Sequence, residues 1–172
     1  ESLVLVSIDG VFSGYVTISD ELKEDAKQSI HQLKALGIKE IIMLSGDKDS
    51  ITQQIAQTLG IAKAKGDLLP EDKLHEVEMM KKDSTKIIAL VGDGINDAPV
   101  LAASDVGIAM GAMGSDVAIE TADVIIQTDQ LSKIITGIKI GKSTQTSIWQ
   151  NIAFAFGVKI IVLVLGAGGL AT

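Results

Sequence analysis

The stretch Leu90-Val91-Gly92-Asp93-Gly94-Ile95-Asn96-Asp97-Ala98-Pro99 is the strongest single indication of how this chain folds. The apolar run 87–91 predicts a buried strand, and the Gly-Asp-Gly turn places Asp93 just beyond its carboxyl end. Asp97 follows four residues later, and Pro99 suits the first turn of a helix. Because ligands of open α/β sheets bind at such strand-to-helix turns, we expect a site here.

The side chains of this turn indicate a magnesium site. Asp93 and Asp97 supply carboxylate oxygens, and Asn96 lies between them. Mg²⁺ prefers a few such oxygens together with waters and a phosphate. The alternative is an acidic turn that only caps a helix. A single Asp-Gly would favour that alternative, whereas this spacing after an apolar strand favours the metal.

Composition narrows the classes of function. The 172 residues suffice for one domain with a core, and 15 basic against 22 acidic residues give a net charge of −7. That charge argues against a general nucleic-acid binder. The absence of cysteine excludes disulfides and a cysteine zinc site. His31 and His75 lie on helical patterns without a paired ligand, so we expect both to be solvated.

The order of apolar runs predicts an α/β protein. A hairpin is expected at 3–16, because Asp9-Gly10 joins two β-rich runs. Further strands are expected at 40–44, 62–65, 87–91, 106–110 and 124–126, with helices at 21–36, 51–59, 69–82 and 131–151 and a helical turn at 115–121. Alternating strands and helices are typical of a parallel sheet with flanking helices.

Two further turns carry groups suited to phosphate. Ser45-Gly46-Asp47 follows one expected strand, and Lys73 opens one expected helix. A hydroxyl, free backbone amides and a lysine can hold phosphoryl oxygens. Taken alone, Ser45 fits a helix-capping turn equally well, and a single lysine is usually only solvated. Together with the Asp93 turn they predict phosphoryl transfer, which depends on charge neutralisation by lysine and Mg²⁺.

The C-terminal part of the chain predicts a membrane-spanning helix. Residues 152–170 contain one charged side chain, Lys159, and their length fits a membrane span. The helix 131–151 leads directly into this segment. Its three lysines, Lys133, Lys139 and Lys142, place the α/β part on the cytoplasmic side.

Four motifs resemble the haloacid-dehalogenase-like phosphorylation domain of P-type ATPases. They are Leu44-Ser45-Gly46-Asp47, Leu69-Pro70-Glu71-Asp72-Lys73, Gly92 through Pro99, and Met110-Gly111 through Ala118. The resemblance implies a Rossmann-like sheet and roles in catalysis for Ser45, Gly46, Asp47, Lys73 and Asn96. It implies that Asp93 and Asp97 hold Mg²⁺ and that Ser45 and Lys73 contact the phosphate. Ser45 stands where the family has threonine, and the hydroxyl is kept.

One motif of that family is absent. The phosphorylated aspartate of P-type ATPases lies in Asp-Lys-Thr-Gly-Thr, which these residues lack. The resemblance therefore implies a C-terminal portion of a pump, inactive alone, whose ATP-binding residues lie mostly elsewhere. The implied parts are return strands of an inserted nucleotide-binding domain (1–17), the phosphorylation domain (18–130), a linker helix (131–151) and a truncated transmembrane helix (152–172).

Two polar residues narrow the subclass, one just before the apolar segment and one within it. Asn151 followed by Lys159 resembles the zinc-, cadmium- and lead-exporting pumps, in which such residues line the path of the metal. Trp149 suits a membrane interface. The implied partners are a divalent metal cation and the plasma or inner membrane, with ATP and Mg²⁺ as cofactors.

Two other functions remain open from the residues. One is a stand-alone phosphatase that uses Asp9 as its nucleophile, although a hairpin turn explains Asp9 better. The other is a non-enzymatic domain that keeps its affinity for Mg²⁺ and phosphate.

Overall fold

The computed structural model describes residues 2–18, 21–92, 97–111 and 120–168. The strands are β1 (Ser2–Ile8), β2 (Val11–Ile18), β3 (Ile42–Leu44), β4 (Lys63–Lys65), β5 (Ala89–Gly92), β6 (Val106–Met110) and β7 (Val124–Ile126). The helices are α1 (Ala26–Ala35), α2 (Asp49–Leu59), α3 (Pro70–Lys81), α4 (Ala98–Ala103) and α6 (Ser132–Ala167). The expected helical turn at 115–121 falls largely outside the described residues.

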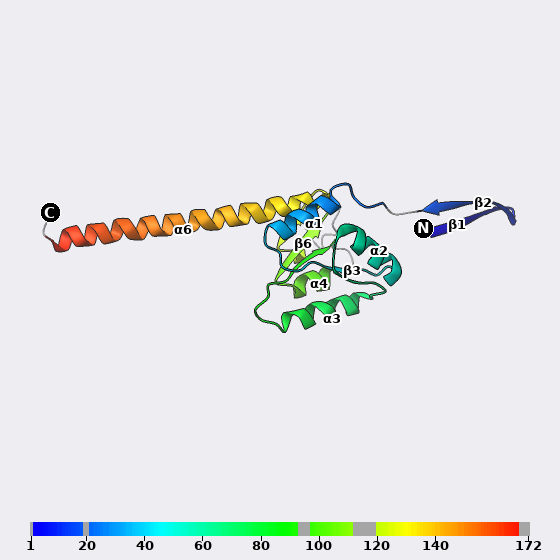
Figure 1. Ribbon diagram of the computed structural model, residues 1–172, viewed down its shortest axis with the longest axis horizontal. Coiled ribbons are helices and arrows are strands. Elements are labelled where there is room, and N and C mark those ends of the chain that lie inside the picture. Colours follow the sequence, from blue (N-terminus) through cyan, green and yellow to red (C-terminus); the bar gives the residue numbers. More distant parts are fainter. Residues whose placement is uncertain (1, 19–20, 93–96, 112–119, 169–172) are drawn as a thin grey trace.

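The strands after β2 are parallel, as the alternation of strands and helices predicted. β3 pairs with β4, and β5, β6 and β7 form a second group in that order. Helices α1 and α2 lie on one side of these strands together with the start of α6, and α3 and α4 lie on the other (Figure 1). Because all these strands run the same way, the turns that follow them reach one edge of the sheet.

Strands β3 and β5 each have an open edge. Among the described strands, β3 bonds only to β4 and β5 only to β6, so each has one side without a partner. The run 87–91 was expected to be buried, and this expectation is wrong for the isolated chain. Ile87 is 84% exposed and Val91 is 40% exposed. The physical reason is that β5 has a neighbouring strand on one side only.

Apolar clusters join the helices to the strands. Ile108, Met110 and Ile126 pack against Ile134 of α6, and Ile30 of α1 packs with Ala56 and Ile61. Leu33 of α1 contacts both clusters. The two groups of strands are therefore linked by α1 although no described strand bridges them.

The boundaries of the helices follow from local chemistry. Helix α2 ends at Gly60, whose φ of +72° is a left-handed conformation that glycine adopts without strain. Helix α3 begins at Pro70, which needs no amide partner in a first turn. The Asp72 carboxylate accepts the Leu69 N–H at 2.9 Å and so fixes the entry to this helix.

Strands β1 and β2 form an antiparallel hairpin that extends away from the α/β domain (Figure 1). Asp9 and Gly10 form its turn with φ of +50° and +79°, the positive values that a tight hairpin turn requires. Its apolar side chains, including Phe12 and Tyr15, are exposed. An isolated two-stranded hairpin is only marginally stable, so this one needs a surface to pack on.

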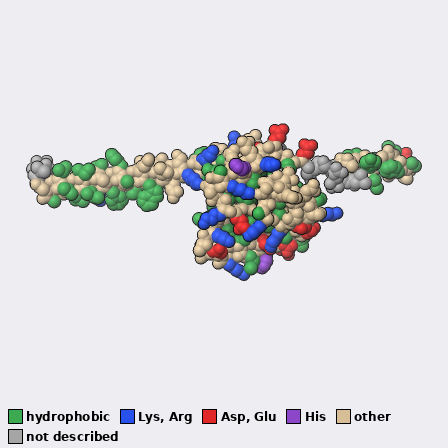
Figure 2. Space-filling model, in the orientation of Figure 1, with side chains coloured by type: hydrophobic (Ala, Val, Ile, Leu, Met, Phe, Trp, Pro, Cys, Tyr) green, Lys and Arg blue, Asp and Glu red, His purple; other side chains and the backbone are tan. Residues whose placement is uncertain are grey.

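Helix α6 is continuous from the domain to the end of the described chain. Its first turns pack on the domain through Ile134 and Ile135, whereas Ile152 and the apolar residues after it are exposed (Figure 2). By length and composition α6 can cross a membrane, and none of its most apolar 18-residue window is buried. The expected linker and span are thus one helix.

Asp105 ties the end of α4 to the start of β5. Its Oδ2 accepts the Ile88 N–H at 2.9 Å, and its Oδ1 lies 3.1 Å from the Lys81 ammonium. The Ile88 amide first, and Lys81 second, hold the pKa of Asp105 below its ordinary value. A depressed folded-state pKa contributes stability above the unfolded-state pKa, and this contribution is lost as pH falls through the folded-state pKa.

We therefore expect Asp105→Asn to weaken the pH dependence of unfolding in acid, below about pH 4. The check is urea unfolding of the wild type and the variant at a series of pH values. The gap in unfolding free energy between the two should close as the pH falls. A gap that stays constant down to the acid transition would contradict the assignment.

Candidate functional site

The turn after β3 presents a hydroxyl that is already hydrogen-bonded. The Ser45 hydroxyl donates to Asp47 Oδ2 at 2.9 Å, and the Asp47 N–H donates back to Ser45 Oγ at 3.1 Å. Ser45 is half-buried, whereas Asp47 is exposed. This pair fixes the hydroxyl at the carboxyl edge of the strands, where a phosphoryl oxygen could take the place of the carboxylate.

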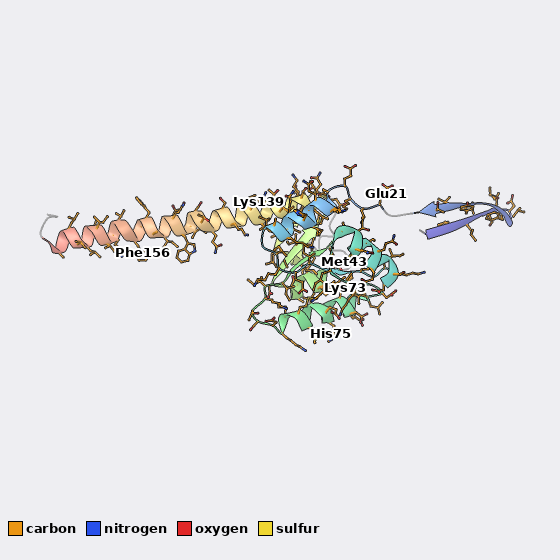
Figure 3. All side chains as sticks on the ribbon, in the orientation of Figure 1. Glu21, Met43, Lys73, His75, Lys139 and Phe156 are labelled. Atoms are coloured by element: carbon orange, nitrogen blue, oxygen red, sulfur yellow. The ribbon has the colours of Figure 1, made fainter. Side chains whose placement is uncertain are left out.

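Lys73 and Asp97 form an ion pair at the same edge. The Lys73 ammonium lies 3.0 Å from Asp97 Oδ1, and the two side chains are 21% and 18% exposed. Lys73 lies on the side of α3 that faces β3, and His75 lies on the opposite side (Figure 3). The pair joins α3 to the start of α4 across 24 positions of sequence.

The backbone around Asp97 directs its carboxylate toward Lys73. The Asp97 carbonyl accepts the N–H groups of Val100 and Leu101 and so begins α4, while its carboxylate makes no capping bond. Gly92 lies against it: a Cβ on Gly92 would be 2.9 Å from Asp97 Oδ2. The glycine at the end of β5 is therefore what lets the carboxylate approach the strand.

The expected site residues separate into three groups. Ser45, Gly46, Asp47, Lys73 and Asp97 come from turns at one edge of the strands. Asp93 and Asn96 lie outside the described residues. Asn151 and Lys159 lie on the exposed part of α6, away from this edge. His31 and His75 are exposed, as expected.

The described part of the site fits Mg²⁺ only in part. Asp97 offers hard oxygen atoms beside the space that Gly92 leaves. Within the described residues no three histidine, cysteine, aspartate or glutamate side chains gather as a metal site. Mg²⁺ often binds through one or two carboxylates, waters and a phosphate, so such a cluster is not required.

The arrangement can bind an anion and a cation next to each other. Ser45 and Lys73 are donors for phosphoryl oxygens, and Asp97 is an acceptor for a cation. In this structure each donor is already bonded to a carboxylate of the chain, Ser45 to Asp47 and Lys73 to Asp97. A phosphoryl group with its metal ion would replace these internal pairs, with Lys73 turning to the phosphate and Asp97 to the metal.

Sequence reasoning missed the direct pairing of Lys73 with Asp97. It also missed Asp49 and Asp67, whose carboxylates connect the turns that follow β3 and β4. A signal for the second pair was present. Gly66-Asp67 directly follows the expected strand 62–65, and Asp49 lies just before the expected helix 51–59, where an acidic side chain is favoured.

A family model described as haloacid dehalogenase-like hydrolase matches residues 2–105. The chain belongs to the haloacid dehalogenase-like hydrolase family. The fold class expected from the sequence is thereby confirmed.

Relatives of this haloacid dehalogenase-like chain are much longer. It is 49% identical to a cadmium, zinc and cobalt-transporting ATPase of Bacillus subtilis (strain 168), over 99% of this chain and 25% of the relative. It is 47% identical to a zinc-transporting ATPase of Synechocystis sp., over 99% of this chain and 24% of the relative. The chain thus spans about a quarter of the length of these relatives.

A solved structure matches the whole arrangement. The crystal structure of a zinc-transporting PIB-type ATPase in the E2.Pi state aligns with a TM-score of 0.82 and 39% identity. The alignment covers 98% of this chain and 27% of that one. The expected resemblance to heavy-metal P-type ATPases is confirmed over nearly the entire chain.

Proposed function

We propose that this chain is the Mg²⁺-binding and phosphate-contacting half of the phosphorylation domain of an ATP-driven exporter of divalent heavy-metal cations. The exporter acts through an aspartyl-phosphate. Lys73 and Ser45 contact the phosphoryl group, Gly46, Asp47 and Asn96 support it, and Asp93 and Asp97 hold Mg²⁺. When bound, Mg²⁺ neutralises charge on the phosphoryl oxygens. ATP is held mostly by parts of the protein outside this chain.

The observation that carries this proposal is that β3 and β5 each have an open edge. β3 and β5 each have one side without a bonded neighbour among the described strands, and β5 exposes apolar side chains. An exposed apolar strand edge is a template for another strand. A strand placed between β3 and β5 would be central and would end beside Lys73 and Asp97. The missing aspartate nucleophile belongs at that end.

The test supplies the missing strand. A polypeptide with an apolar strand followed by Asp-Lys-Thr-Gly-Thr is produced together with this chain, either fused upstream or as a separate segment. We expect ³²P from inorganic phosphate, in the presence of Mg²⁺, to enter the fused or reconstituted protein as an acyl phosphate that hydroxylamine removes. The matched control replaces the aspartate of the added motif by asparagine.

The result that would contradict the proposal is activity without the added strand. If residues 1–147 alone hydrolyse phosphate esters, and Asp9→Asn abolishes this, the chain is a stand-alone phosphatase. The structure does not favour that alternative, because Asp9 lies in the turn of a hairpin that extends away from Lys73 and Asp97. Instead, the hairpin is proposed to belong to an inserted nucleotide-binding domain that covers its apolar faces.

We assign α6 to the membrane-spanning part of the exporter. The helix is exposed and apolar beyond Ile152, and its length is sufficient to cross a membrane. Lys133, Lys139 and Lys142 precede the apolar part, which supports a cytoplasmic position for the α/β domain. Lys159 lies eight residues beyond Asn151, or about 12 Å deeper along the helix. A lysine there costs about 2.5–3.5 kcal/mol on insertion, which favours a functional role in the metal path.

We expect Lys159→Ala in the full-length protein to lower zinc-stimulated ATP hydrolysis about tenfold, equivalent to about 1.4 kcal/mol. The reason is the loss of the one charged side chain in the apolar segment. Hydrolysis is measured in reconstituted vesicles with zinc, cadmium or lead. The matched control is Lys139→Ala, on the same helix before the apolar part. Unchanged zinc stimulation in Lys159→Ala would remove this residue from the metal path.

A further inference from the structure

The turn after β3 and the turn after β4 are held together by reciprocal hydrogen bonds. We call the residues that make these bonds the loop clasp: Ser45, Asp47, Asp49, Gly66, Asp67 and Leu68. The Asp49 N–H donates to Asp67 Oδ2 at 3.0 Å, and the Gly66 N–H donates to Asp49 Oδ1 at 2.8 Å. Two backbone bonds run alongside, from the Asp67 N–H to the Asp47 carbonyl and from the Leu68 N–H to the Ser45 carbonyl.

The clasp leaves no room for a side chain at position 66. A Cβ on Gly66 would lie 2.3 Å from the Asp49 Cα and 2.8 Å from the Asp47 carbonyl oxygen. The two turns are therefore in direct backbone contact. A displacement of one turn must displace the other, because the hydrogen bonds run in both directions.

Asp67 is held in an unfavourable backbone conformation. Its φ is +55°, in the left-handed region that is unfavourable for most residues and that glycine adopts freely. An aspartate is kept there with its carboxylate on the first amide of α2, where the helix dipole favours a negative charge. The hydrogen bond of the Asp67 side chain thus offsets an unfavourable backbone conformation, which glycine would adopt without strain.

The clasp is connected to both phosphate donors. On one side it contains Ser45. On the other side Leu68 is followed by Leu69, whose N–H is bonded to the Asp72 carboxylate, and by Pro70, which begins α3. Lys73 lies in the first turn of that helix. The positions of the Ser45 hydroxyl and the Lys73 ammonium are therefore set by one rigid unit.

We propose that Asp49 and Asp67 are positioning residues that fix Lys73 relative to Ser45 for phosphate binding. This inference rests on the proposed function of the same site. Neither carboxylate contacts the phosphoryl group. Each acts through the loop that carries a donor, in the way that outer residues orient the ligands of a metal site.

The test uses the full chain in detergent micelles, with lysines ¹³C-methylated so that the Lys73 resonance reports its ion pair with Asp97. That resonance is assigned with Lys73→Arg and calibrated with Asp97→Asn. Inorganic phosphate is then titrated in the presence of Mg²⁺. Asp67→Gly removes the carboxylate and introduces a residue that accepts the left-handed backbone conformation. Asp67→Asn keeps an acceptor oxygen. The matched control is Asp83→Gly, which removes a turn carboxylate at the other end of α3.

We expect Asp67→Gly to weaken phosphate binding about tenfold and to move the Lys73 resonance toward its position in Asp97→Asn. Asp67→Asn should restore both values, and Asp83→Gly should change neither. If Asp67→Gly accelerates hydrogen exchange at the Asp49 amide yet leaves both values as in the wild type, the proposal is overturned. An equal loss in Asp83→Gly would overturn it as well.

The two readouts separate this proposal from the function on which it rests. If the wild-type chain shows no Mg²⁺-dependent phosphate binding, the proposed function fails. The Lys73 resonance still decides whether the clasp positions that side chain, because the ion pair with Asp97 exists without phosphate.

Discussion

Replacing Lys73 by alanine is expected to lower the rate of aspartyl phosphorylation by about 10²–10³-fold in the full-length protein. The ammonium is the one cationic side chain of the described residues that pairs with Asp97 at this edge of the strands. Phosphoryl transfer depends on such a charge more than on acid or base groups. The measurement is the rate of ³²P incorporation from ATP in single-turnover experiments.

The matched control for this variant is Lys65→Ala. Lys65 pairs with Glu76 on the same helix α3, but its side chain is more than half exposed. Exposed ion pairs contribute about 0–1 kcal/mol, so phosphorylation and stability should both stay near wild-type values. Equal losses in Lys65→Ala and Lys73→Ala would show that a general change of surface charge, rather than the position of Lys73, causes the effect.

Truncating Leu101 to alanine is expected to lower the free energy of unfolding by about 2–5 kcal/mol. Leu101 lies on α4, is 1% exposed and packs with Ala109 and Leu90 against the strands. Its N–H also bonds to the Asp97 carbonyl, so a cavity here loosens the turn that carries the carboxylate. Urea unfolding of the full chain in detergent, followed by circular dichroism, measures the change.

The control for the cavity is Ile87→Ala. Ile87 is equally apolar and precedes β5, but it is 84% exposed in this chain. Its truncation should change the unfolding free energy by no more than about 0.5 kcal/mol. When the upstream strand is added, Ile87→Ala should become more destabilising, because that strand would cover β5. A constant small effect in both settings would contradict the proposed position of the strand.

Much of the fold was predictable from local patterns. The apolar runs and the turns after them located every described strand to within about two residues, and Gly60 and Pro70 marked helix ends. Such features depend on residues that are close in sequence. The continuous α6 was predictable too, because no proline interrupts the sequence from 132 to 167.

The exposure of β5 was not predictable in this way. Its all-apolar sequence is typical of a strand with neighbours on both sides, and the prediction of burial follows from that pattern. Whether β5 has a second neighbouring strand depends on another part of the polypeptide. The apolar pattern of the run 87–91 carries no information about that part. The exposed apolar side chains of β5 are the main support for the proposed additional strand.

By itself the sequence determined the chemistry of the Gly92–Pro99 turn, of Ser45 and of Lys73, because oxygen and ammonium groups at strand ends are recognisable from residue type and spacing. Only the tertiary structure decided that Lys73 pairs with Asp97 and that Asp49 and Asp67 join two turns. These contacts depend on distances between segments that are far apart along the chain. Such distances are set by the packing of helices on strands.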